Sequence, residues 1–505
     1  MNIKKRNILA ATSLLLNLII VILSFKSSPF SNILNEHDST MFMYFGKAMN
    51  NGMTPYIDMF DHKGIVLFWI QQLGNFIGFG NFSTGIWIVE IIFYLVTLTF
   101  LFKTCLLITK NVLTSSLTIL LLTGSMIISL SGGNYSEEFA LTFISIACFY
   151  FTRIILNNYQ TKSSLIIIGI TGGLTFFIRS NMVALWLVFC MYFIIESIIN
   201  RSFKLFAERF IYIFIGGLST CLIVIIYALI KGNFDEMIYQ TFVLNVQYSS
   251  GNSLMDKIGA AKSFLEFSSR IGIIPFICIT FIYILLDKDR IQKNRLIYFA
   301  TVFVYLLVNF TTVILSGRYY NHYFITMIAP IVILSGIGIC GFSTLLKTDI
   351  RRVLFYLIIG ILPLSYSYLA VRDLVKTPMT TIPNQKRSSL VITQANYIKD
   401  HTQSSDYIYV HNIDANIYLY SNRYSNSKFF VLPSLDYRNF DDLKRDFLND
   451  MKNEPPKFIV LRKDSFDKNS QDDERINKSL KKVILSDYSP VTRFTDTEYL
   501  MFKKK

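Results

Sequence analysis

Apolar segments of about twenty residues recur along the first 370 residues of this 505-residue chain. The hydrocarbon core of a bilayer is about 30 Å thick, and a helix needs about 20 apolar residues to cross it. Charged residues make up 16% of the chain, whereas soluble proteins carry about 25%. These features exclude a soluble enzyme, a disordered chain and a disulfide scaffold. They predict an all-α polytopic membrane protein.

Eleven segments are apolar enough to be membrane-spanning helices. They are residues 8–25, 84–103, 112–131, 138–157, 164–178, 182–199, 210–230, 271–286, 296–315, 323–346 and 353–370. The first follows Lys4-Lys5-Arg6 but has no small-residue cleavage site after it, so we interpret it as an uncleaved anchor rather than a signal peptide.

The distribution of basic residues predicts the orientation. Of the 26 Lys and Arg in residues 1–370, 17 fall in the short connections that are inside if the N-terminus is cytoplasmic. Basic residues concentrate in cytoplasmic loops, so the net charge of +15 reflects membrane topology and not binding to nucleic acid. We predict a multi-pass protein of the plasma membrane with its N-terminus in the cytoplasm. The predicted outer loops are 26–83, 131–138, 232–270 and 316–322.

The last 135 residues differ in composition from the rest. Residues 371–505 hold 23 basic and 18 acidic residues, a charge density typical of soluble domains. We expect a membrane domain over 1–370 and a small extracytoplasmic α/β domain over 371–505. The pattern predicts helices at 389–402 and 439–452, and strands at 407–410, 458–461, 482–485 and 498–502.

Polar residues gather in the predicted outer loops, and the first loop has two helical patterns. Apolar residues from Met41 to Met49 recur at helical spacing and predict an amphipathic helix on the membrane surface. A second apolar stretch starts at Ile65, just after Lys63-Gly64. Asp38 is therefore expected at the start of one helix, and Lys63 just before the next.

Four segments resemble motifs of a known enzyme class. They are Glu36 to Gly64, Asn134 to Phe139, Ile178 to Asn181, and Gly317 to Tyr323. In this order they resemble bacterial membrane glycosyltransferases of the GT-C fold class, which includes protein O-mannosyltransferases and the aminoarabinose transferase of lipid A. The resemblance covers nearly the whole chain. One departure is Ile65, where many relatives have proline.

The resemblance implies transfer of a sugar from a polyprenyl-phosphate carrier to a cell-surface polymer, glycolipid or protein, by inverting displacement. It implies that Asp38 is the catalytic base. A lipid phosphate is a good leaving group, so the reaction needs a base on the acceptor and cations around the phosphate. Lys63, Arg318 and His322 are the candidates for binding that phosphate.

Each candidate also has a structural interpretation. Asp38 could serve as a helix N-cap, since Asp is favoured there. Lys63 and Arg318 could extend their charges from the membrane surface into water. His322 lies among tyrosines and could belong to an interfacial aromatic belt.

The remaining candidates lie in the same loops. Glu137 and Glu138 could bind the acceptor or a cation, or simply favour the start of a helix by their charge. Glu36, Asp58, Asp61 and Arg179 are secondary candidates. The spacing Asp58-x-x-Asp61-His62 is not a metal signature by itself, so a divalent cation such as Mg²⁺ or Mn²⁺ remains an open question.

Two other classes compete with the enzyme. A transporter or flippase of lipid-linked sugars would carry inverted repeats and polar helices at the membrane midplane. Here the polar groups gather at the outer edge, and no repeat is visible. A non-catalytic surface scaffold would make the loop charges interchangeable.

Overall fold

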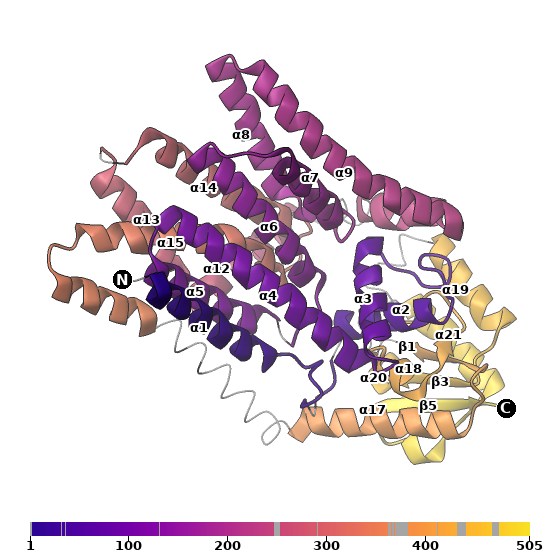
Figure 1. Cartoon of the computed structure of the whole chain (residues 1–505). Coiled ribbons are helices and arrows are strands. Elements are labelled where there is room, and N and C mark those ends of the chain that lie inside the picture. The colour runs from indigo at the N-terminus through magenta and orange to yellow at the C-terminus, as the bar shows by residue number, and fades with distance from the viewer. Residues whose placement is uncertain are drawn as a thin grey trace. The chain divides into compact units, whose positions relative to one another are not determined.

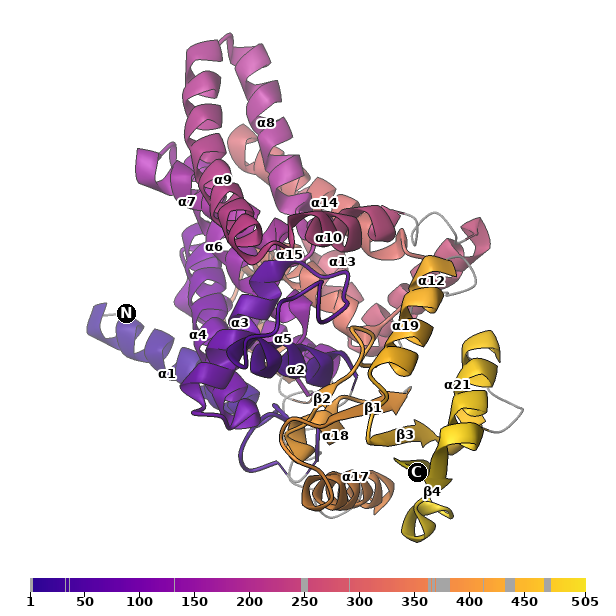
Figure 2. The same ribbon diagram turned by 90° about the vertical axis from the view of Figure 1, so that its right-hand side faces the viewer.

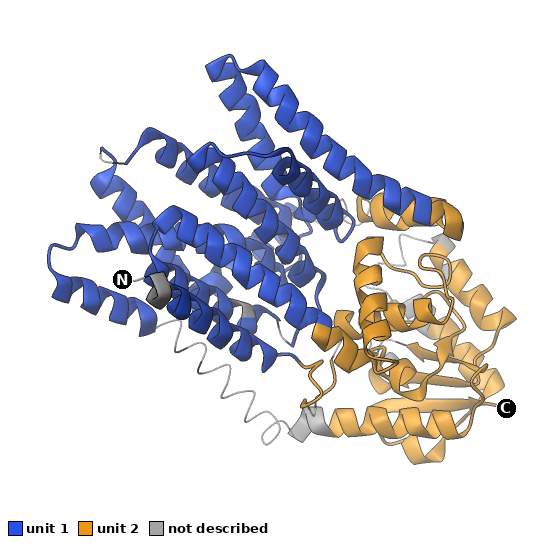
Figure 3. Cartoon of the chain, viewed as in Figure 1, with its two compact units in different colours: residues 1–25, 89–227, 249–377 blue, residues 26–88, 228–248, 378–505 orange. Residues whose placement is uncertain are grey.

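The computed structural model describes most of the chain. The described residues are 3–31, 33–35, 37–130, 132–246, 253–289, 291–361, 365, 368, 382–411, 413–431, 441–466 and 474–505. They form two compact units, neither of which is contiguous in sequence (Figure 3). Unit 1 comprises residues 1–25, 89–227 and 249–377, and unit 2 comprises residues 26–88, 228–248 and 378–505.

Unit 1 is built from helices (Figure 1). Its helices are α1 (Ile3–Ile22), α5 (Val112–Leu130), α6 (Ser136–Asn157), α7 (Lys162–Phe176), α8 (Ala184–Asn200), α12 (Leu254–Arg270), α13 (Ile274–Asp287), α14 (Lys293–Ile314) and α15 (Ile328–Leu345). Two 3₁₀ turns, η1 (Ser180–Met182) and η3 (Asn321–Met327), precede α8 and α15. Helices α4 (Phe82–Thr109) and α9 (Phe203–Lys231) extend across the boundary between the units.

The polytopic helical fold expected from the sequence is confirmed. Among the described residues, six helices are long and apolar enough to cross a membrane: Phe82–Thr109, Val112–Leu130, Ser136–Asn157, Phe203–Lys231, Lys293–Ile314 and Asn321–Leu345. A seventh span exists if α12 and α13, which meet at an angle of 85°, count as one. Three other expected spans are shorter apolar helices, Asn7–Ile22, Lys162–Phe176 and Ala184–Asn200. Of the last expected span, 353–370, residues 353–361 are described and helical, whereas most of the residues after 361 lie outside the described part of the chain.

Small residues allow close packing between α13 and α15. A Cβ atom on Gly338 would lie 2.7 Å from the backbone nitrogen of Thr280, which leaves no room for a side chain. The Thr280 hydroxyl donates to the carbonyl of Leu334 at 2.7 Å. In an apolar environment, close backbone approach and hydrogen bonds between helices replace the hydrophobic effect as the source of association.

Unit 2 combines helices and a five-stranded sheet (Figure 2). Its elements are α2 (Asp38–Asn50), α3 (Ile65–Ile77), α10 (Phe234–Ile238), the π-helical turn η2 (Tyr239–Val243), α17 (Ile382–Asp400), β1 (Tyr407–His411), α18 (Asn416–Ser421), β2 (Tyr424–Ser425), α19 (Asp441–Asn453), β3 (Phe458–Arg462), α20 (Lys463–Phe466), α21 (Glu474–Asp487), β4 (Tyr488–Pro490), η5 (Thr492–Phe494) and β5 (Tyr499–Lys504).

The sheet is mixed, with strand order β2-β1-β3-β5-β4. Strand β1 pairs in parallel with β2 and β3, whereas β5 is antiparallel to β3 and β4. Helix α17 lies on one side of the sheet, and α19 and α21 lie on the other (Figures 1 and 2). The mixed α/β tail expected from the sequence is therefore confirmed.

The hydrophobic core between the sheet and α19 and α21 is completed by residues from the two long loops. Phe60, from the first loop, and Leu244, from the loop before α12, are buried in the same cluster as Tyr409 and Phe429. The Phe60 and Phe429 rings lie 5.0 Å apart between centroids. The tail thus forms its core together with segments that are distant in sequence.

Most elements expected in the tail are present, but the strand predicted at 482–485 is wrong. These residues belong to α21. Leu480 and Ile484 are buried at helical spacing, while Leu485 is 63% exposed. A short apolar run fits either a strand or a helix by composition, and here helical spacing determined the outcome.

The two helices expected in the first loop are confirmed as α2 and α3. The amphipathic pattern predicted only some of the residues of α2 that are buried. Phe42 and Met43 are buried as well as Tyr44, Phe45 and Ala48, because elements of unit 2 cover more than one face of this helix.

Candidate functional site

The first cluster of charged side chains, here called the first-loop cluster, comprises Asp38, Asp61, His62 and Lys63. Asp61 and Lys63 are buried, with exposed fractions of 4% and 6%. The Lys63 ammonium lies 3.7 Å from Asp61 Oδ1, and His62 Nδ1 lies 3.6 Å from the same oxygen. Lys63 also places its ammonium 5.5 Å from the centre of the Phe42 ring.

The electrostatics of this cluster connect Asp38 to Asp61. Burial raises the pKa of the Asp61 carboxyl above its ordinary value, and the nearby negative charge of Asp38 raises it further. The Lys63 charge and the Lys63 backbone N–H, which donates to Asp61 Oδ1 at 2.9 Å, offset part of this shift. The fold therefore brings two of the sequence candidates, Asp38 and Lys63, within electrostatic range of Asp61.

The turn that precedes this cluster is fixed by Tyr56 and Asp58. Tyr56 has a left-handed φ of 70°, and its hydroxyl donates to the Lys63 carbonyl at 2.8 Å. Asp58 accepts the Thr54 backbone N–H at 2.7 Å, which is a typical turn-stabilising contact. Asp58 thus has a structural partner, whereas Asp61 faces the charged groups.

Two amide side chains that the sequence analysis missed hold the same segment. Gln240 accepts the Asp61 backbone N–H at 3.3 Å and donates to the Tyr56 carbonyl at 2.7 Å. Asn245 donates to the His62 carbonyl at 2.9 Å. Gln240 lies in the π-helical turn η2, a feature often found at functional sites. The only signal in the sequence was a polar amide within an otherwise apolar stretch.

The second cluster, here called the second-loop cluster, lies in unit 1 and comprises Glu137, Arg179 and Tyr323. Arg179 donates to Glu137 Oε1 at 2.5 Å and to the Tyr323 hydroxyl at 3.1 Å. Its guanidinium lies 4.8 Å from the Tyr323 ring centre. The other oxygen of Glu137 accepts from the Ser136 hydroxyl at 2.9 Å. Arg179 is thus the partner of Glu137, a pairing that the sequence did not predict.

A narrow pocket opens beside this ion pair. Its lining residues are Glu137, Arg179, Asn181, Met182, Asn309, Thr312, Val313, Tyr323 and Thr326. They come from α6, the η1 turn, α14 and η3, so four segments converge on the pair.

Glu138 lies next to Glu137 but points to a different environment. Its Oε2 accepts the Asn134 backbone N–H at 2.9 Å, while its buried Oε1 has no hydrogen-bond partner among the described residues. Gly133 adopts a φ of 90°, and a Cβ there would lie 2.4 Å from Glu90 Oε1. The loop before α6 is therefore packed directly onto the acid Glu90 of α4.

His322 is held among aromatic rings. It stacks on Tyr135 with ring centroids 4.4 Å apart and on Tyr320 at 5.5 Å. Arg318 lies in the turn after α14, where its backbone N–H donates to the Ser316 hydroxyl at 3.4 Å. Glu36 lies outside the described residues. Within the described part of the chain, no three His, Cys, Asp or Glu side chains are arranged to hold a metal ion.

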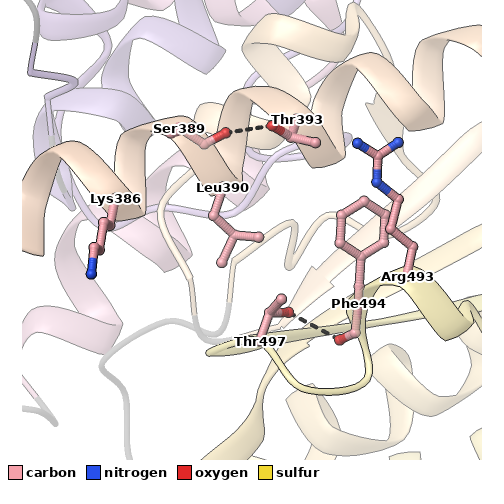
Figure 4. Close-up of a pocket in the computed structure, with 7 residues that line it drawn as sticks. All are labelled: Lys386, Ser389, Leu390, Thr393, Arg493, Phe494 and Thr497. Atoms are coloured by element: carbon pink, nitrogen blue, oxygen red, sulfur yellow. Dashed lines mark hydrogen bonds between the residues drawn. The ribbon is translucent and has the colours of Figure 1, made fainter.

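A further pocket lies in the tail, between α17 and the segment from η5 to β5 (Figure 4). Its lining residues are Lys386, Ser389, Leu390, Thr393, Arg493, Phe494 and Thr497. It contains two cations but no carboxylate among these residues.

Two family models match the chain. The model described as "Putative competence-induced protein Ccs4 N-terminal domain" matches residues 2–352, and that of the Ccs4 C-terminal domain matches residues 384–505. No curated protein sequence matches the chain significantly.

Solved structures show which fold the chain shares. ArnT from Cupriavidus metallidurans, bound to undecaprenyl phosphate, is similar with a TM-score of 0.61 and 12% identity, over 96% of each chain. The same protein in the apo state is similar with a TM-score of 0.62 and 12% identity, over 98% of each chain. The GT-C-like fold expected from the sequence is confirmed, and at this identity the likeness concerns the fold.

Proposed function

The chain belongs to the Ccs4 family, and from this premise and its ArnT-like fold we propose that it is a membrane glycosyltransferase. The proposed donor is a sugar on polyprenyl phosphate, and the acceptor is a hydroxyl or similar group at the cell surface. The observation that carries the proposal is the first-loop cluster, where Asp38 at the start of α2 and the buried Lys63 both act electrostatically on Asp61. The undecaprenyl phosphate bound to ArnT supports this class of donor.

In the proposed reaction Asp38 takes the proton from the acceptor hydroxyl. The acceptor oxygen bonds to the anomeric carbon, and the bond from that carbon to the phosphate oxygen breaks with its electron pair. Polyprenyl phosphate leaves, and the configuration at the anomeric carbon inverts. Lys63 contributes positive charge to the phosphate as its negative charge grows. Arg318 and His322 are the other residues proposed to bind phosphate.

The remaining acids have supporting roles in this proposal. Asp61 orients Lys63 and His62 through its Oδ1 atom, which lies 3.7 and 3.6 Å from their side-chain nitrogens. Glu137 and Glu138 stay candidates for the acceptor side, with Glu137 held by Arg179. No step of the proposed reaction requires a divalent cation.

The direct test uses purified protein in nanodiscs supplied with undecaprenyl phosphate that carries single radiolabelled sugars, tried one by one with cell-envelope extract. Release of undecaprenyl phosphate and labelling of an envelope component are expected, and parallel reactions with chelator show whether a metal is needed. Movement of intact sugar lipid across vesicles without cleavage would instead support a flippase.

The proposed orientation has its own test. Single cysteines at the exposed positions Asn81 and Asn422 should react with an impermeant thiol reagent in intact cells. Cysteines at Asn157 and Asn294, also exposed, should react only after lysis. Labelling of the Asn294 position in intact cells would contradict a cytoplasmic N-terminus with this order of loops.

A further inference from the structure

Helix α2, which carries Asp38, begins at a residue with an unfavourable backbone. His37 has φ 45° and ψ −124°, a left-handed conformation that favours glycine. Its side chain makes no hydrogen bond that caps the helix. A non-glycine residue keeps such a conformation only where its surroundings hold it. The residue just before the proposed base is therefore held from outside α2.

The tail supplies those contacts through three consecutive residues. Asp414 Oδ1 accepts the His37 backbone N–H at 2.5 Å. The Ala415 backbone N–H donates to the Thr40 hydroxyl at 3.1 Å, and the Asn416 amide donates to the Asn35 carbonyl at 2.6 Å. These contacts reach positions before and after Asp38, so they bracket it along the chain.

The rest of α2 is attached to the same part of unit 2. Tyr44 accepts the Ser425 backbone N–H at 3.0 Å, and its ring stacks on Phe430 with centroids 4.2 Å apart. The Lys47 ammonium donates to the Leu419 carbonyl at 2.8 Å. Contacts along more than two turns fix both the position and the rotation of the helix.

We propose that residues 414–416, here called the clamp, position Asp38 for catalysis, and that Asp414 is a positioning residue of the enzyme. This inference rests on the proposed function of Asp38 as the base. It gives the extracytoplasmic tail a role in the reaction, although the tail has no catalytic motif of its own. Asp414 acts through the His37 backbone and does not touch the substrate.

The expected consequence is a loss of turnover rather than of donor binding. A base must lie within hydrogen-bond reach of the proton that it removes, and a displacement of about 1 Å can lower the rate by about 10²-fold. The donor phosphate is proposed to bind Lys63, whose contacts with Asp61 and Tyr56 do not involve the clamp. Weakening the clamp should therefore lower kcat and leave the KM for the donor nearly unchanged.

Two substitutions and one control test the clamp in the full-length protein. Asp414→Ala removes the acceptor oxygen, whereas Asp414→Asn retains an oxygen that can accept the same N–H. Asp406→Ala is the matched control. It removes an aspartate of the same tail that accepts a backbone N–H, from Gln403 at 2.8 Å, but that contact lies within the tail's own turn.

The first measurement, hydrogen exchange followed by mass spectrometry, does not depend on activity. The Thr40 and Met41 amides donate to the His37 carbonyl, at 3.0 and 3.1 Å, so their exchange reflects the position of His37. Their exchange should be about tenfold faster in Asp414→Ala. It should stay near the wild-type rate in Asp414→Asn and Asp406→Ala. Unchanged exchange in Asp414→Ala would overturn the clamp, whether or not the protein transfers sugar.

The second measurement is transfer from radiolabelled undecaprenyl-phosphate sugar, corrected for the amount of folded protein. In Asp414→Ala, kcat should fall about tenfold or more at constant KM, and Asp414→Asn should recover most of it. Faster exchange with unchanged kcat would assign the clamp a structural role only and overturn the positioning proposal. If the wild-type protein transfers no sugar, the proposed function fails, while the exchange data still decide whether the clamp holds α2.

Discussion

The two charged clusters differ in how tightly acid and cation are joined. In the second-loop cluster, Arg179 lies 2.5 Å from Glu137 and also donates to Tyr323. In the first-loop cluster, the Lys63 ammonium lies 3.7 Å from Asp61, longer than a hydrogen bond. Arg179 is hydrogen-bonded to its acid, whereas the Lys63 ammonium lies beyond hydrogen-bond distance from Asp61 and within it, at 3.3 Å, of His62 Nε2.

We propose that this difference separates a structural ion pair from a site that can accept a ligand. A guanidinium held in two directional hydrogen bonds is fixed in orientation. An ammonium on a four-carbon chain at a longer distance can turn toward an incoming phosphate while keeping its Coulomb attraction to the carboxylate. On these grounds we propose that the base and the phosphate site belong to the first-loop cluster, and that the Arg179 pair in the second-loop cluster fixes Glu137 in place.

The largest effect that this assignment predicts is loss of turnover in Asp38→Asn. The amide keeps the volume of the side chain but cannot take a proton, and a positioned base contributes about 10²–10⁴-fold. Transfer should fall by about that factor in single-turnover assays with labelled donor, while expression and folding stay normal. Asp58→Asn, which affects only a turn contact, is the matched control. Near-normal turnover in Asp38→Asn would leave Asp38 only the role of an acidic residue in the first turn of α2, where negative charge is favourable, and would end the contrast between the clusters.

The next effect concerns stability, in the second-loop cluster. Glu137→Gln leaves the Arg179 charge without its buried partner, so the free energy of unfolding should fall by about 3 kcal/mol. Chemical unfolding in detergent measures this change. Glu266→Gln is the control, because its pair with Lys262 is exposed and long at 3.9 Å, and such pairs contribute little. Equal losses of unfolding free energy in the two variants would show that burial does not make the pair of Glu137 and Arg179 more stabilising than the exposed pair.

A smaller effect concerns donor binding by Lys63 in the first-loop cluster. Lys63→Ala should weaken binding of undecaprenyl phosphate by about 1.5–3 kcal/mol, the range for a hydrogen bond to a charged group, and Lys63→Arg should retain part of it. Asp38→Asn should leave this affinity unchanged, since a base acting on the acceptor does not bind phosphate. Lys428→Ala, which removes a lysine paired with Asp446 in the same unit, is the control. Titration in nanodiscs provides the values, and unchanged affinity in Lys63→Ala would reject the phosphate site.

The smallest effect concerns Lys47. Its ammonium donates to a backbone carbonyl, unlike that of Lys63, which lies beside an acid. Burial, and then the charges of Lys399 and Arg423, lower the pKa of Lys47 to about 8. The unfolded chain has a lysine pKa of about 10.4, so between about pH 8 and 10 it binds more protons than the folded state. The Lys47 contribution to stability therefore rises with pH over this range.

Lys47→Met should remove this pH dependence. The difference in unfolding free energy, wild type minus variant, should increase by about 1–2 kcal/mol from about pH 8 to about pH 10. Lys428→Met should show no such increase. A flat difference for Lys47→Met would mean that the ammonium is solvated in the folded protein.

The sequence allowed prediction of the helical membrane fold and of most elements, because both depend on local patterns. Segments of apolar residues indicate spans, and helical spacing of apolar residues indicates α2. It allowed prediction of Asp38 and Lys63 as candidates through the motif that contains them. It did not allow prediction of which acid accompanies Lys63, since Asp58 and Asp61 both lie close to it along the chain, and only the folded turn at Tyr56 directs Asp61 inward.

Other contacts involve residues that no local rule connects. Arg179 meets Glu137 across 42 positions, Gln240 reaches Asp61 across 179, and Asp414 reaches His37 across 377. By itself the sequence determined that the chain enters a membrane, that its tail is an α/β domain and that polar residues gather in the predicted outer loops. The tertiary structure decided which of those residues are paired, which are buried, and that the tail holds the helix carrying Asp38. Pairing and burial depend on which distant segments exclude water from one another, and this is settled only when the chain has folded.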